Sequence, residues 1–116
     1  FRHFVPKPTY AKSSLYIFYN QEYGPCGALD LRHYLTERLL NGGGHIGYGI
    51  RPSLRGKGYA PYMLGLGIEK AQDKGIDRAL VCCDSDNPAS ARTIEDCGGV
   101  LENVTDQGMR RYWITI

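Results

Sequence analysis

The run Arg55-Gly56-Lys57-Gly58-Tyr59-Ala60 decides how this sequence folds, because it joins a strand pattern to a helix pattern. The residues before it, His45–Ile50, have the composition of a strand, and apolar residues recur at helical spacing after it until Gly75. A strand, a glycine turn and a helix N-terminus together form a site for phosphate, since the free N–H groups and the helix dipole face the turn. The sequence therefore predicts that the backbone of this turn binds a phosphorylated ligand. The arginine and lysine of the run add positive charge.

Two nucleotide-binding motifs are excluded by their spacing. A Walker A loop requires glycine where Arg51 stands and serine or threonine where Gly58 stands. A dinucleotide fingerprint requires its third glycine where Pro52 or Pro61 stands, depending on the starting glycine. An ATP-binding, kinase-like fold therefore remains only as a weaker alternative, which preferential binding of ATP with Mg²⁺ would favour.

A different phosphate-binding pattern does fit the run. Arg-x-x-Gly-x-Ala at Arg55, Gly58 and Ala60 resembles the coenzyme A pyrophosphate loop of the GNAT superfamily of acyl-CoA N-acyltransferases. On the residues alone, a glycine turn before an ordinary helix is the alternative interpretation.

A second segment adds to the resemblance. Asn87-x-x-Ser90, followed by Gly98-Gly99, resembles the second GNAT motif, which is usually Asn-x-x-Ala with a glycine closing the helix. The interval from Arg55 to Asn87 leaves room for one crossover helix and the next parallel strand. Asn87 is also a suitable N-cap and Pro88 a suitable first helical residue, which is a purely structural explanation for both. The resemblance extends over Val5–Ile116.

The pattern of the whole chain, residues 1–116, indicates a single mixed α/β domain. Strands are expected at Leu15–Tyr19, Cys26–Leu31, His45–Ile50, Asp77–Cys83, Val100–Val104 and Met109–Ile116. Phe1–Ser14 is expected to be irregular, and Arg32–Gly44 to be a longer connection with a turn of helix. The central sheet is antiparallel at its start, has a strand–helix–strand crossover in its middle and carries helices packed on it. The resemblance implies the GNAT fold, N-terminally incomplete, because its opening strand and two helices have no counterpart before the first expected strand.

The resemblance implies acetyl-CoA as co-substrate. Its binding residues by this carry-over are Ile50, Arg55, Gly56, Lys57, Gly58, Tyr59, Ala60, Asn87 and Ser90. The pantetheine arm is expected between the strand His45–Ile50 and the strand around Leu80–Cys83. Gly47 and Gly49 are expected to mark a bulge or a close approach of the ligand, since glycine inside a strand often does so.

The implied reaction is N-acetyl transfer by direct attack of a primary amine on the thioester carbonyl. Some relatives carry a glutamate and a tyrosine as proton acceptor and donor, but Cys82 and Ile94 stand at those positions here. Our candidate catalytic residues are therefore His45, as a proton relay through water, and Tyr48, facing the thioester. A structural hydrogen-bonding role for the histidine remains open, as does catalysis by proximity without a dedicated base.

The amine acceptor is expected to bind beside the connection Arg32–Gly44. His33 and Glu37 lie on the connection expected to border the acceptor pocket, and we assign them to substrate binding. A small molecule or a peptide could supply the amine. Exposed sheet edges near the closing hairpin could pair two copies as a homodimer.

Composition excludes several other classes. The chain has 116 residues, 42% hydrophobic, and a net charge of +2, which is too mild and too scattered to indicate nucleic-acid binding. No apolar run approaches the length of a membrane span. The four cysteines have no C-x-x-C or metal-ligand spacing, so we expect no metal and a reducing, cytoplasmic location. A non-catalytic acyl-CoA-binding or regulatory module of the same fold remains the main alternative function.

Overall fold

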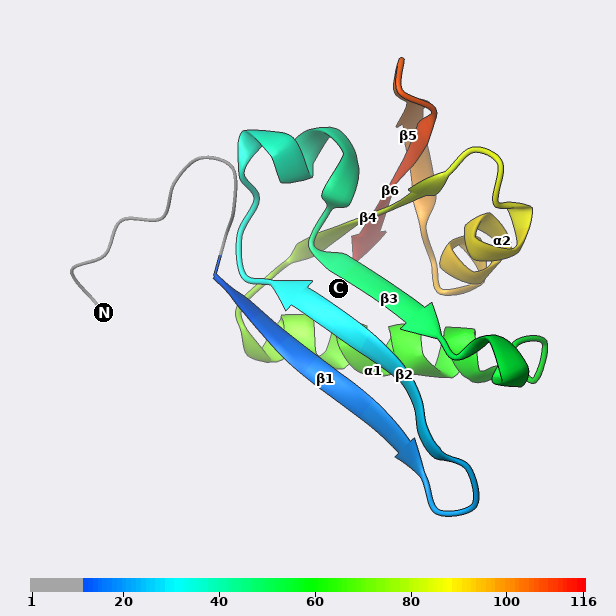
Figure 1. The fold of residues 1–116 in the computed structure, drawn as a ribbon. Helices are drawn as coiled ribbons and strands as arrows, with labels where there is room; N and C mark the ends of the chain where they lie inside the picture. Colours follow the sequence, from blue (N-terminus) through cyan, green and yellow to red (C-terminus); the bar gives the residue numbers. More distant parts are fainter. Residues whose placement is uncertain (1–11) are drawn as a thin grey trace.

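A computed structural model describes residues 12–116, in which one six-stranded sheet has the order β1-β2-β3-β4-β6-β5 (Figure 1). The strands are β1 (Ser13–Asn20), β2 (Gly24–Arg32), β3 (Ile46–Ile50), β4 (Arg78–Asp84), β5 (Val100–Val104) and β6 (Met109–Thr115). The helices are η1 (Leu39–Gly43), η2 (Pro52–Leu54), α1 (Tyr59–Asp73) and α2 (Pro88–Asp96). The mixed α/β architecture predicted from the sequence is confirmed. None of the helices within the described residues is long and apolar enough to cross a membrane.

The N-terminal half of the sheet differs from the prediction in its boundaries. β1 begins at Ser13, so the last part of the stretch expected to be irregular is a strand paired with β2, and residues 1–11 of that stretch lie outside the described residues. β3 begins at Ile46 and not at His45. The pairing of β3 with β2 has no register shift, so Gly47 and Gly49 do not mark a bulge. The other expectation for them, a close approach of the ligand, stays a prediction.

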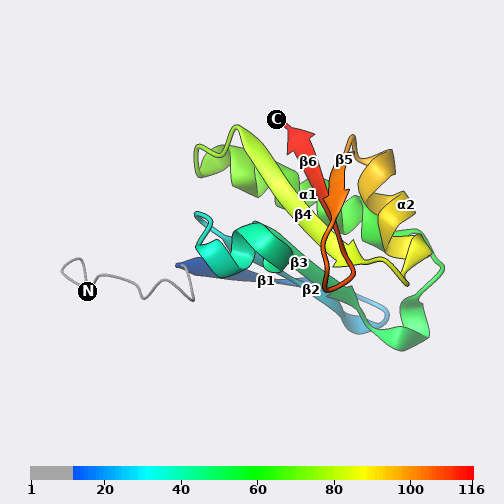
Figure 2. The same ribbon diagram turned by 90° about the horizontal axis from the view of Figure 1, so that it is seen from above.

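The two faces of the sheet carry different helices (Figure 2). Tyr112 of β6 is fully buried and donates its hydroxyl to Glu95 of α2 at 2.6 Å. Arg111, the preceding residue, donates to the carbonyl of Leu40 in η1 at 2.8 Å. Because successive side chains of a strand point to opposite faces, α2 and η1 cover opposite faces of the sheet. The thiol of Cys97, at the end of α2, lies 3.7 Å from the carbonyl of a residue in α1, so the two α-helices share one face.

The core lies between this face of the sheet and α1. Its members are apolar side chains of β2, β3, β4, β6 and both α-helices, including Leu29, Leu31, Ile46, Met63, Leu64, Val81, Ile94 and Tyr112. Gly67 of α1 belongs to the same contact, because a Cβ there would lie 2.5 Å from a methyl carbon of Leu29. The crossover helix therefore packs closely on the antiparallel part of the sheet, and its N-terminus is held at the end of β3.

The junction between β3 and β4 is the irregular part of the sheet. These parallel strands share one ladder pair, Ile46 with Val81. The backbone N–H of His45 donates to the carbonyl of Leu80 at 2.7 Å just before it. Beyond this pair the strands separate toward their C-terminal ends, so the backbone of Tyr48 and Ile50 is paired with β2 on one side only. The sheet thus contains a fork that opens toward the glycine turn.

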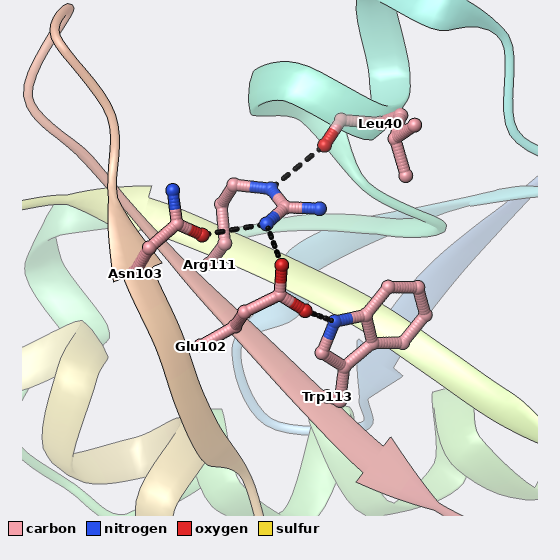
Figure 3. Close-up of polar contacts among 5 residues, drawn as sticks. All are labelled: Leu40, Glu102, Asn103, Arg111 and Trp113. Carbon is pink, nitrogen blue, oxygen red and sulfur yellow. Dashed lines mark hydrogen bonds and ion pairs between the residues drawn. The ribbon is translucent and has the colours of Figure 1, made fainter.

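On the opposite face, Arg111 links three elements (Figure 3). Its guanidinium contacts Glu102 at 2.8 Å and Asn103 at 2.6 Å, both in β5, in addition to the η1 carbonyl. The same carboxylate accepts a hydrogen bond from Trp113. These contacts hold η1 on the closing hairpin of β5 and β6, and the bonds from Arg111 and Trp113 lower the pKa of Glu102.

We expect Arg111→Ala to lower the free energy of unfolding by about 2–3 kcal/mol, because hydrogen bonds to charged groups are worth roughly 1.5–3 kcal/mol. Urea denaturation at pH 7 measures the change. Arg92→Ala, at an exposed position of α2, is the control and is expected to change stability by about 0.5 kcal/mol or less. Equal stabilities for the two variants would contradict the linking role of Arg111.

Candidate functional site

A cleft of about 540 Å³ lies where the fork meets the glycine turn. Its lining comes from the end of β3, the turn, the start of α1 and the start of α2. The lining residues are Tyr48, Gly49, Ile50, Leu54, Arg55, Gly56, Gly58, Tyr59, Ala60, Pro61, Asn87, Ala89, Ser90 and Thr93. The volume is within the usual range for small-ligand sites, and the cleft is open to solvent.

The turn between η2 and α1 leaves its backbone accessible. Gly56 and Gly58 have φ of 80° and 84°, a left-handed conformation that glycine adopts without steric cost. Among the described residues beyond its chain neighbours, a Cβ at either position would meet no atom within 4 Å, so the space beside each glycine is open. Gly58 is the N-cap of α1, no side chain caps this helix, and its first turn contains no acidic residue. The first-turn N–H groups therefore remain available to an anion.

The second helix bordering the cleft begins differently. Asn87 accepts a hydrogen bond from the backbone N–H of Ser90 at 3.1 Å, and Pro88 occupies the first turn. The predicted N-cap is confirmed. Because a side chain already uses one of its free donors, α2 is a weaker anion site than α1.

Tyr48 reaches across the cleft from β3 to α2. Its hydroxyl lies 3.0 Å from the hydroxyl of Ser90, and either can donate. Partial burial raises the pKa of Tyr48 above its usual value of 10.0, although the bond to Ser90 opposes this shift. The phenol therefore stays protonated at neutral pH and can donate a proton inside the cleft.

The structure brings together eight of the nine residues predicted to bind the cofactor. Those residues are Ile50, Arg55, Gly56, Gly58, Tyr59, Ala60, Asn87 and Ser90. The guanidinium of Arg55 also donates to the carbonyl of Ile50 at 3.3 Å, which holds it at the end of β3. Lys57 is the exception. Its ammonium lies 5.8 Å from the ring centre of Tyr23, in the turn between β1 and β2, and it does not line the cleft.

The catalytic role expected for His45 is not supported by its position. This side chain is buried, does not line the cleft, and accepts the backbone N–H of Leu80 at its Nδ1 atom over 2.9 Å. Burial lowers the pKa of His45, which favours the neutral ring that this bond requires. The histidine closes the base of the fork, because its ring replaces a backbone acceptor between β3 and β4.

We expect His45→Leu to lower the free energy of unfolding at pH 8 by about 1–3 kcal/mol, because it leaves a buried N–H without a partner. In the wild type, the unfolded chain takes up a proton at this histidine before the folded chain does. Stability should therefore fall as pH decreases below about 6.5, and this part of the pH dependence should disappear in the variant. Urea denaturation between pH 8 and pH 5 measures both effects, with Arg92→Ala, at an exposed position of α2, as control. An unchanged pH dependence in His45→Leu would contradict the assignment.

The residues predicted to bind the acceptor lie far from the cleft. His33 bonds through Nε2 to the hydroxyl of Ser14 at 2.7 Å. Partial burial lowers its pKa, and the charge of Lys74 adds to the effect. Because Lys74 follows the C-terminus of α1, whose 15 residues span about 22 Å, His33 lies at the end of the sheet opposite the cleft. Glu37 is exposed beyond the same end. Neither residue lines the cleft, so the structure does not bring them together with the predicted cofactor-binding residues, and their role in acceptor binding stays a prediction.

The two positions that carry an acid and a base in some relatives are unsuited to proton transfer here. Ile94 is fully buried in the core, and burial raises the pKa of Cys82 to about 11, so neither can exchange a proton readily at neutral pH. All four cysteines are free thiols. Sequence reasoning missed the lining residues Leu54, Pro61, Ala89 and Thr93. Thr93 could have been found, because it follows Ser90 by three residues and so shares its helix face.

Comparison with known proteins agrees with this architecture. The sequence profile of the acetyltransferase (GNAT) domain family matches residues 9–100. No curated protein matches the sequence. The structure resembles spermidine N-acetyltransferase from Vibrio cholerae solved with CoA and spermine, with a TM-score of 0.73 and 14% identity over 89% of this chain. A structure provisionally named as a phosphinothricin N-acetyltransferase aligns with a TM-score of 0.73 and 15% identity, over 93% of this chain and 75% of its own. The chain spans 65% of the length of the Vibrio cholerae protein.

Proposed function

This chain belongs to the GNAT acetyltransferase family, and from that membership we propose that it transfers an acetyl group from acetyl-CoA to a primary amine. The observation that carries the proposal is that the fork between β3 and β4 opens, in one cleft, onto the uncapped N-terminus of α1. A phosphate-bearing group and an extended arm can therefore bind side by side there.

The glycine turn supports binding of the diphosphate part of CoA. Gly56 and Gly58 let the backbone approach the phosphates, and the first N–H groups of α1 donate to them. Arg55 adds a charge-assisted contact. The extended arm pairs with the backbone edge of β3 at the fork, where the N–H and C=O of Tyr48 and the N–H of Ile50 have no partner in β4 and the Ile50 carbonyl accepts from Arg55. This pairing uses the same groups that a neighbouring strand would use.

Tyr48 is the residue of the cleft best suited to proton transfer. The amine attacks the thioester carbonyl and loses a proton to water, and the carbon–sulfur bond breaks with its electron pair going to sulfur. The protonated phenol donates a hydrogen bond, and then its proton, to that sulfur. Ser90 holds the phenol in place through the 3.0 Å contact between the two hydroxyls. A backbone N–H of β3 at the fork stabilises the charge that develops on the carbonyl oxygen.

The identity of the acceptor follows only from resemblance. The Vibrio cholerae relative was solved with spermine, so polyamines are the first amines to test. Identity to that structure is 14%, which supports the fold but does not determine the acceptor.

Incubation of the protein with acetyl-CoA and a panel of amines, including spermidine, lysine peptides and aminoglycosides, tests the proposal. Release of free thiol that depends on both the protein and an amine is expected. Tight CoA binding without thiol release from any amine would instead favour the non-catalytic acyl-CoA-binding module. Cys82 and Ile94 cannot replace the acid and base of some relatives. This observation favours the non-catalytic module as the second candidate function.

A further inference from the structure

The rim of the cleft carries more positive charge than a diphosphate requires. Arg51, Arg55 and Lys57 stand within seven residues, with no acidic residue among them. All three are exposed, and within residues 12–116 none of them forms an ion pair. Of the three, Arg55 lines the cleft and the other two do not.

Arg51 and Lys57 converge on Tyr23 outside the cleft. The guanidinium of Arg51 donates to the carbonyl of Tyr23 at 3.0 Å and to the hydroxyl of Ser53 at 3.0 Å. The ammonium of Lys57 lies 5.8 Å from the centre of the Tyr23 ring. One cation that precedes η2 and one inside the glycine turn are thus held beside one residue of the β1–β2 turn. These contacts use neutral partners, so both positive charges remain uncompensated.

Coenzyme A carries a second anionic group, which does not bind at the glycine turn in the proposed complex. Besides its diphosphate it has a phosphate monoester on the 3′ oxygen of the ribose, which carries close to two negative charges at pH 7, as phosphate monoesters do. We propose that Arg51 and Lys57 form a separate subsite, beside Tyr23 at the rim of the cleft, that binds this 3′-phosphate. The inference rests on the proposed function, since it concerns the same ligand.

The subsite gives the protein a means to distinguish CoA from its 3′-dephospho form. Two exposed cations facing one dianion are expected to give about a tenfold preference for CoA, because exposed ion pairs contribute little individually. This preference should decrease as salt concentration rises, since exposed charges are screened. The diphosphate contacts are common to both ligands and do not contribute to the ratio.

Calorimetric titration of the full chain with CoA and with 3′-dephospho-CoA tests the proposal. The variants are Arg51→Gln, Lys57→Gln and the double variant, with Lys74→Gln as a matched control at the other, exposed end of α1. In the wild type and in the control, CoA is expected to bind about tenfold more tightly than its dephospho form. In the double variant, CoA affinity should fall to that of dephospho-CoA, while the affinity for dephospho-CoA stays the same.

Three outcomes would overturn the inference. Equal affinities of the wild type for the two ligands, or an undiminished ratio in the double variant, would remove the 3′-phosphate subsite and leave the proposed function standing. Binding of neither ligand to the wild type would remove both.

Discussion

Gly58→Val is expected to lower the affinity for CoA by about 100-fold, the loss of roughly two charge-assisted contacts to the phosphates. The residue is the N-cap of α1 and lines the cleft with φ of 84°. A Cβ there would meet no protein atom within 4 Å, so a valine side chain would occupy the space left for the ligand. The branched side chain also disfavours the left-handed backbone that directs the first-turn N–H groups outward. Calorimetric titration with CoA measures the effect.

Gly75→Val is the matched control, because Gly75 differs from Gly58 mainly in its place along α1. It has φ of 81°, a Cβ at this position would also meet no atom within 4 Å, and it follows the opposite end of the same helix. Both substitutions should therefore destabilise the fold by a similar amount, about 1–3 kcal/mol. Only the change at Gly58 should affect CoA binding. Equal CoA affinities for the two variants would show that the entrance of α1 does not hold the diphosphate.

Tyr48→Phe is expected to reduce kcat by about 10²-fold or more, the contribution typical of a positioned general acid. The change removes one hydroxyl, so the shape of the cleft and the KM for acetyl-CoA should change little. Since burial raises the pKa of Tyr48, the phenol donates throughout the neutral range, and wild-type kcat should decline from loss of this proton only above about pH 10. That decline should be absent in the variant. Steady-state kinetics as a function of pH, with the best amine from the panel, measures both effects.

Two further variants separate proton donation from a structural effect. Tyr62→Phe makes the same chemical change at an exposed position of α1 outside the cleft and should leave kcat unchanged. Ser90→Ala removes the partner that orients the phenol and should reduce kcat by a smaller factor, roughly 3- to 10-fold, as expected for loss of one neutral hydrogen bond. A Tyr48→Phe variant with wild-type kcat would exclude the tyrosine as the proton donor.

Much of the fold follows from patterns that are local in the sequence. The glycine turn needs positive φ at Gly56 and Gly58, and the residue type alone indicates this conformation. Asn87 and Pro88 mark the start of α2 by the chemistry of helix ends, which also depends on neighbouring residues only. The expected strands and the crossover helix are confirmed for the same reason, since their periodicity is a property of a continuous segment.

The residues that the structure places away from the cleft have partners distant in the sequence. Imidazole chemistry at the start of the third expected strand predicts a proton relay at His45, but its ring bonds to Leu80 across the fork. The connection that carries His33 and Glu37 is expected to border the acceptor pocket, yet β2 leads it to the end of the sheet far from the cleft. A histidine or glutamate looks the same in the sequence whether it lies in a cleft or far from it. The sequence pattern therefore cannot distinguish the two locations.

The sequence by itself determined that this chain is a mixed α/β protein with a glycine turn of positive φ before α1, because backbone conformation there depends on the residues of the turn. Only the tertiary structure decided that Tyr48 contacts Ser90 across the cleft and that Lys57 lies beside the Tyr23 ring outside the cleft. It also decided that β3 and β4 separate after one ladder pair. Each of these depends on how strands far apart in the sequence are packed against the helices. The direction of a side chain relative to a distant element is set by that packing, which no local pattern contains.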